Sequence, residues 1–111
     1  QGIPLHEIRN TTPIYTNDSA KPLNAVFVCF TTELNEFRGD GRMLVLTYPE
    51  ESKAEFSIGA MQAGNFKHYY LVSLARSPKG TRTEIQRSPS DYLPLPQKEI
   101  VDIAIKCMRP R

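Results

Sequence analysis

Residues 54–76, AEFSIGAMQAGNFKHYYLVSLAR, have the pattern of two strands joined by a turn. Over residues 54–60 apolar side chains alternate with polar ones such as Glu55, the period of a strand with one buried face. Residues 67–76 are more apolar, and Gly64 lies in a turn-like segment between the two. The stretch therefore predicts an antiparallel hairpin.

Two further strands are expected on either side of this hairpin, over residues 42–48 and 81–87. The separators 49–52 and 77–80 are short enough to join antiparallel neighbours, so the simplest topology is a four-stranded meander. One face of the sheet should be exposed to solvent. The expected inward sets of the first and third strands are Leu44, Leu46 and Tyr48, and Tyr70, Val72 and Leu74.

Segments with the apolar spacing of a helix lie before and after the four predicted strands. Residues 21–37 repeat apolar side chains at i, i+3, i+4 and i+7, with Pro22 suited to a first turn and Gly39 to a C-terminal cap. Residues 97–108 show the same spacing, and Pro110 follows them. We predict two helices that cover the apolar face of the sheet.

These elements define an α+β fold with the order α-β-β-β-β-α, a four-stranded antiparallel meander with two helices packed on one face. Residues 1–20 contain prolines and turn formers and are expected to be an extended N-terminal arm. Residues 21–111 are expected to form a single domain, a size at which one core is usual.

The two cysteines, Cys29 and Cys107, lie far apart in apolar segments, which fits neither a zinc cluster nor a CxxC motif. Both belong to the predicted helices, so both should lie in the layer over the sheet, where a disulfide is geometrically reasonable. Two buried free thiols are the alternative, since free cysteine often behaves as a small hydrophobe. A bridge would indicate an oxidising compartment.

The chain resembles small exported bacterial proteins, often lipoproteins, of mostly unassigned function. The resemblance is carried by Cys29 within residues 25–37, by residues 68–74 followed by Gly80-Thr81, and by residues 103–107, which end in Cys107. It implies the α-β-β-β-β-α order and a bridge from the first helix to the chain end. It carries over no active-site residue.

The charge composition argues against nucleic acid as a partner. Fourteen Lys and Arg against twelve Asp and Glu give a net charge of +2 without a charge block, so nucleic acid is not an expected partner. A cytosolic nucleic-acid binder using Arg76, Arg82 and Arg87 is a rival that predicts reduced thiols. The sequence leaves open a membrane tether upstream of Gln1 and does not indicate the oligomeric state.

No catalytic, cofactor or metal site is expected. The two histidines, His6 and His68, are too far apart in sequence to suggest a metal site, and no nucleophile motif occurs. The candidate partner contacts lie at and after the Gly64 turn: Met61, Phe66, His68 and Tyr69. For Met61 the alternative is that it folds back into the core, and for the aromatic residues that they serve cross-strand packing.

The expected function is a non-enzymatic binding or accessory domain of the bacterial cell envelope, periplasmic or extracellular, acting on another envelope protein through protein–protein contact. A sharper alternative in the same class is a periplasmic immunity-type inhibitor of a secreted toxin. A different class is a small hydrolase-like domain with a pocket between helices and sheet, in which His68 or Glu36 would be the polar group.

Overall fold

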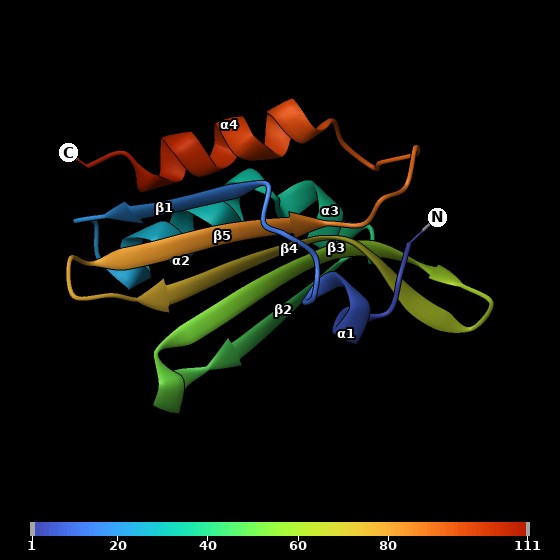
Figure 1. The fold of residues 1–111 in the computed structure, drawn as a ribbon, viewed down its shortest axis with the longest axis horizontal. Coiled ribbons are helices and arrows are strands. Elements are labelled where there is room, and N and C mark those ends of the chain that lie inside the picture. The colour runs from blue at the N-terminus through green and yellow to red at the C-terminus, as the bar shows by residue number, and fades with distance from the viewer. Residues whose placement is uncertain (1, 111) are drawn as a thin grey trace.

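The computed structural model describes residues 2–110. Gln1, upstream of which the sequence leaves a membrane tether open, and Arg111 lie outside the described residues. Over the described part, one five-stranded antiparallel sheet has the order β1-β5-β4-β3-β2 (Figure 1). Its strands are β1 (Tyr15–Ser19), β2 (Met43–Tyr48), β3 (Lys53–Gln62), β4 (Asn65–Arg76) and β5 (Thr81–Arg87). The class is α+β, as predicted.

The meander β2-β3-β4-β5 is confirmed, with each strand antiparallel to the next. The expected four-strand count is wrong by one, because Tyr15–Ser19 pairs along its whole length with β5. This segment lies in the expected extended arm, whose Asn17, Asp18 and Ser19 favour turns when read alone. Tertiary pairing overrides that local preference.

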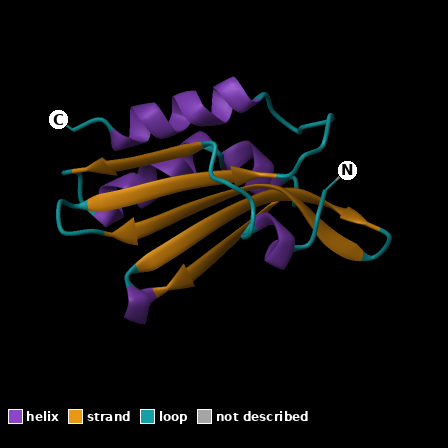
Figure 2. Ribbon diagram, in the orientation of Figure 1, coloured by secondary structure: helices purple, strands orange, loops and turns teal. Residues whose placement is uncertain are grey.

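Two long helices, α2 (Leu23–Glu33) and α4 (Gln97–Met108), pack side by side on one face of the sheet, as predicted (Figure 2). The expected 21–37 helix is interrupted at Leu34, whose φ of −104° departs from helical geometry, and continues as α3 (Asn35–Gly39). The interruption keeps both Leu34 and Phe37 in the core. Pro96 precedes α4 in an extended conformation, which suits a first-turn boundary.

The core lies between this helix layer and the sheet. Phe56 on β3 contacts the rings of Phe27 and Phe30 on α2, at centroid separations of 5.3 and 5.7 Å. The inward set Tyr70, Val72 and Leu74 is confirmed, and all three side chains are fully buried. Aromatic and β-branched packing of this kind supplies much of the stabilisation of a small sheet.

A disulfide joins Cys29 on α2 to Cys107 on α4, with a Cα–Cα distance of 5.5 Å. This confirms the bridge and leaves neither cysteine of the chain as a free thiol. The covalent link ties together the two helices that cover the core, over a sequence separation of 78 residues. A disulfide in a domain of this size is compatible with an extracellular or envelope location.

The inward set predicted for β2 is wrong. Val45 is paired with Phe56, and Leu44 with Ser57, so Leu44, Leu46 and Tyr48 lie on the face opposite α2. Met43 is the buried side chain at the start of the strand, whereas Leu44 is 40% exposed. Because both alternate sets of β2 are apolar, the hydrophobic pattern could not determine its register.

The face opposite α2 and α4, which we call the polar face, carries Glu55, Ser57, Arg82, Glu84 and Gln86. This face is not exposed to solvent throughout, because Glu55 and Ser57 are only 1% and 0% exposed. The short helix α1 (Leu5–Ile8) contacts β4 from this side, with Ile8 fully buried, and it lies in front of the sheet in Figure 1. The N-terminal segment is thus part of the packed structure.

Candidate functional site

The far end of the β3–β4 hairpin projects beyond its neighbouring strands (Figure 2). The β2 ladder ends at Ile58 and the β5 ladder at Tyr70, so the remainder of the hairpin is a two-stranded ribbon that only Ile3, through a bridge to His68, joins from the side within the described residues. Its turn is formed by Ala63 and Gly64, with φ values of 52° and 81°. Two successive positive φ values are typical of a type I′ turn, whose twist matches the right-handed twist of the flanking strands. The tip therefore has a defined conformation.

The ribbon begins at a β-bulge between Ile58 and Gly59. A Cβ atom at Gly59 would lie 2.0 Å from the carbonyl oxygen of Lys67 and 2.7 Å from an edge atom of the Phe66 ring. Only glycine allows this approach. The missing side chain lets Phe66 lie over the backbone and contact the ring of His68, with the centroids 5.1 Å apart.

The four candidate contact residues have different surroundings. Met61 is 63% exposed and is paired with Phe66, which is partly buried. His68 and Tyr69 are 6% and 3% exposed and offer little surface to a partner. Met61 therefore does not fold back into the core, and the accessible part of the predicted contact is Met61 with the partly buried Phe66.

Because of the bulge, the Tyr69 side chain lies on the other side of the ribbon. Its ring packs edge-on against Tyr92, and its hydroxyl oxygen accepts a hydrogen bond of 2.9 Å from Gln62. Tyr92 lies in the proline-rich connection after β5 and is 67% exposed. The aromatic pair fixes the base of the ribbon against this connection, so Tyr69 has a packing role, although its partner is a loop residue and not one on a neighbouring strand.

His68 is hydrogen-bonded through Nδ1 to the hydroxyl of Ser57 on the polar face. Burial, followed by the charges of Arg9 and Lys67, lowers the pKa of His68 below its ordinary value, which favours a neutral imidazole. The backbone of His68 also exchanges hydrogen bonds of 2.8 and 3.0 Å with Ile3. This histidine joins β3, β4 and the N-terminal segment.

A hollow of about 350 Å³ lies on the polar face and is lined by charged and polar side chains. Arg9, directly after α1, donates hydrogen bonds to both carboxylate oxygens of Glu55, one of them 2.8 Å long. The Tyr48 hydroxyl donates a further bond of 3.2 Å to Glu55. Opposite them, Arg82 is ion-paired with Asp18 and Glu84.

The ion pair at this hollow determines the charge state of Glu55. Burial alone would raise the pKa of the Glu55 carboxyl, but the hydrogen bonds and charge of Arg9 outweigh burial and lower it. The hydrogen bond from Arg9 to Glu55 correspondingly raises the pKa of Arg9. The carboxylate stays ionised and paired. Its lone pairs are used by Arg9 and Tyr48, so it supports the fold here and is not poised as a general base.

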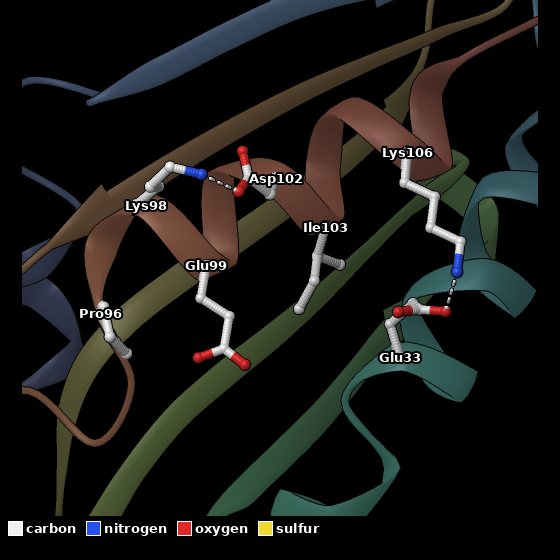
Figure 3. Close-up of a pocket in the computed structure, with 7 residues that line it drawn as sticks. All are labelled: Glu33, Pro96, Lys98, Glu99, Asp102, Ile103 and Lys106. Atoms are coloured by element: carbon white, nitrogen blue, oxygen red, sulfur yellow. Dashed lines mark hydrogen bonds and ion pairs between the residues drawn. The ribbon is translucent and has the colours of Figure 1, made fainter.

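A second hollow, of about 490 Å³, runs along α4 on the side that faces α2 (Figure 3). Its charged side chains are largely paired: Lys98 with Asp102 at 2.6 Å, and Lys106 with Glu33 at 2.8 Å. Ile103 and Pro96 are its apolar lining residues (Figure 3). Glu36 and His68, the polar groups expected for a hydrolase-like pocket, do not line it.

The described residues contain no group of three His, Cys, Asp or Glu side chains arranged to hold a metal ion. His6 is exposed on α1. None of the helices in residues 2–110 combines the length and apolarity that a membrane crossing requires.

Sequence reasoning missed Arg9 as the partner of Glu55 and Ser57 as the partner of His68. Glu55 and Ser57 alternate with buried apolar residues, which usually indicates exposure, and the cover comes from a segment 46 positions away from Glu55. A search for cations within the N-terminal arm would have been the available signal.

No family model, curated protein or solved structure matches this chain.

Proposed function

We propose that this chain is a non-enzymatic protein-binding domain of the bacterial cell envelope, periplasmic or extracellular, that contacts another envelope protein through the tip of its β3–β4 hairpin. The observation that carries the proposal is the 63% exposure of Met61 at the end of a structured, projecting ribbon. The disulfide and the earlier resemblance to exported bacterial proteins support the envelope location.

The tip has the properties of a contact surface that is formed before binding. Met61 and Phe66 form a cross-strand pair of the two residue types, methionine and aromatic, that are enriched at protein interfaces. Their positions are set by the Ala63-Gly64 turn and by the close packing at Gly59. A contact surface that is ordered in the free protein loses little conformational entropy when it binds.

Capture experiments with three immobilised proteins test the proposal: the wild type, Met61→Asp and the control Val28→Asp. Val28 lies on α2, away from the hairpin, and is also a large exposed apolar residue, at 54%. We expect one envelope protein to be retained by the wild type and the control and lost with Met61→Asp. The purified partner should then bind the wild type at least about tenfold more tightly than Met61→Asp.

Loss with both variants would indicate general apolar adhesion and would refute a specific tip contact. Equal binding to all three proteins would show that the partner uses another surface. The immunity-type role is a special case of the proposal, in which the captured partner would be a secreted toxin.

A further inference from the structure

Two adjoining hollows lie at the end of the sheet opposite the hairpin tip, where β4 turns into β5 (Figure 1). The inner hollow, of about 250 Å³, lies between α2 and the adjacent ends of β2, β3 and β4. The outer hollow, of about 360 Å³, lies beside the β4–β5 turn. Leu23, Asn24 and Arg76 line both hollows, so a single ligand could extend from one into the other.

The surface of the inner hollow is mostly apolar. Leu23 and Phe27 on α2 are only partly buried there, and Ala54 on β3 is the neighbour of Thr47 in the sheet. Because the Ala54 side chain is a single methyl group, the sheet does not fill the space beside Phe27. A hollow of this kind suits a hydrocarbon group, since it offers few hydrogen-bond partners to a polar one.

Arg76 adds a positive charge where the two hollows meet. It follows Leu74 by two positions on β4, which puts both side chains on the face that the helices cover. Arg76 and Lys79, a second cation in the outer hollow, are exposed and make no ion pair within the described residues. None of the described carboxylates lines either hollow. By contrast, Lys98 and Lys106 at the hollow along α4 are both ion-paired.

We propose that the two hollows bind a small carboxylate with an apolar chain, such as a medium-chain fatty acid. The chain would occupy the inner hollow and the carboxylate would bind Arg76. A guanidinium holds a carboxylate through two parallel hydrogen bonds, and the Asn24 amide can donate a further one. Charge complementarity favours an anionic ligand over a neutral one, because both cations lack a counter-charge in the described part of the chain.

The outer hollow has fixed walls. Ser77 and Gly80 exchange backbone hydrogen bonds of 3.1 Å across the β4–β5 turn, and the Thr81 hydroxyl donates a 2.7 Å bond to the carbonyl of Lys21. The turn is thereby tied to the connection before α2. A site that is ordered in the free protein loses little conformational entropy on binding. This site is separate from the hairpin tip and does not depend on the proposed function.

Titration of the oxidised protein with octanoate, followed by amide chemical shifts, is the first test. We expect saturable binding with a Kd of about 0.1–1 mM, typical of a ligand this small, and shifts at Asn24, Thr47 and Gly80. Acetate carries the charge without the chain, and octanol carries the chain without the charge. Each should bind about tenfold more weakly than octanoate or less tightly still.

Arg76→Gln tests the carboxylate contact without changing the packed part of the site. It should weaken octanoate by about tenfold and leave octanol unchanged. Arg38→Gln is the matched control, because Arg38 on α3 is also exposed, makes no ion pair in the described residues and lines neither hollow. It should bind octanoate like the wild type.

Ala54→Ile tests the inner hollow. The larger side chain should fill the space and weaken octanoate by about tenfold or more, with an unchanged circular dichroism spectrum showing that the variant is folded. Met61→Asp, which tests the hairpin tip, should bind octanoate normally, so the two proposals can fail separately.

Three results would overturn the proposal. Octanol that binds as tightly as octanoate, or octanoate that binds Arg76→Gln as it binds the wild type, would show apolar adhesion without recognition of the carboxylate. No saturable binding of octanoate would remove the site altogether. Tighter binding of N-acetylleucine than of octanoate would assign the hollows to the C-terminus of a polypeptide instead of a fatty acid.

Discussion

Arg9 and Glu55, 46 positions apart in the chain, are joined by two hydrogen bonds on the polar face of the sheet. The Glu55 side chain is 1% exposed and that of Arg9 is 38% exposed. The backbone carbonyl of Arg9 also accepts a 2.9 Å bond from Gln86 on β5. This one residue therefore fixes the N-terminal segment to both β3 and β5 and neutralises a buried carboxylate.

Replacing Arg9 with Met should destabilise the fold by about 2–3 kcal/mol. The cost arises because Glu55 would keep a buried charge without its partner. It is smaller than for a fully buried pair because water can reach part of Arg9. Urea unfolding measures the change.

The double variant Arg9→Met/Glu55→Met should recover much of this loss, since it leaves no unpaired charge. Arg82→Met is the matched control, because its pairs with Asp18 and Glu84 lie at the surface, and it should change stability little. If Arg9→Met also left stability unchanged, the role assigned to the buried pair would be wrong.

Stability should fall on acidification in two stages. The pKa of His68 is lowered in the folded state, so the unfolded chain binds more protons and stability declines as pH falls below the ordinary value of 6.5. The pKa of Glu55 is also lowered, and its contribution is lost as pH falls below 4.5 and through the folded value. Unfolding free energies from about pH 8 to about pH 2 test both stages.

His68→Asn should abolish the upper stage and leave the lower one. Asparagine can still hydrogen-bond Ser57 but does not titrate. A wild-type stability that is constant between neutral pH and about pH 5 would contradict the assignment to His68.

Removing the disulfide should cost about 4–5 kcal/mol by the chain-entropy relation for a closed loop of this length. The comparison is between the oxidised wild type and Cys29→Ala/Cys107→Ala in urea. Alkylation without a reductant should add no mass to the native protein, because both thiols are used in the bridge. Two alkylated thiols in native material would remove the argument for an oxidising compartment.

Gly59→Ala should destabilise the hairpin by about 2–4 kcal/mol, since its methyl group would overlap the Lys67 carbonyl oxygen. Gly39→Ala is the matched control, because a Cβ at Gly39 has no neighbour within 4 Å. We expect the control to be neutral or slightly stabilising at the end of α3. Equal effects of the two substitutions would show that the close approach at the bulge is not required.

The sequence predicted those elements whose own periodicity is strong. Strand β5 occupies the expected residues 81–87, and α4 the expected 97–108. The bridge between Cys29 and Cys107 followed from placing both residues on helices of one layer. These features could be predicted because the hydrophobic pattern of each segment fits one structure.

The features of the fold and the candidate site that the sequence did not predict depend on contacts between distant segments of the chain. Strand β1 has few apolar residues and exists through its pairing with β5, and the four-residue α1 has no capping side chain. The exposed Met61 could be placed at a turn, but His68 is buried by contacts with Ser57 and the N-terminal segment, and Tyr69 packs against Tyr92, which alternation alone does not show.

Site-specific photo-cross-linking in cells is the decisive measurement for the proposed contact between the hairpin tip and another envelope protein. A photoreactive amino acid would replace Met61 at the hairpin tip or, as the control, Val28 on α2. We expect one discrete adduct with another protein from position 61 and none from position 28. If both positions gave the same adducts, or position 61 gave none, the proposed tip contact would be wrong.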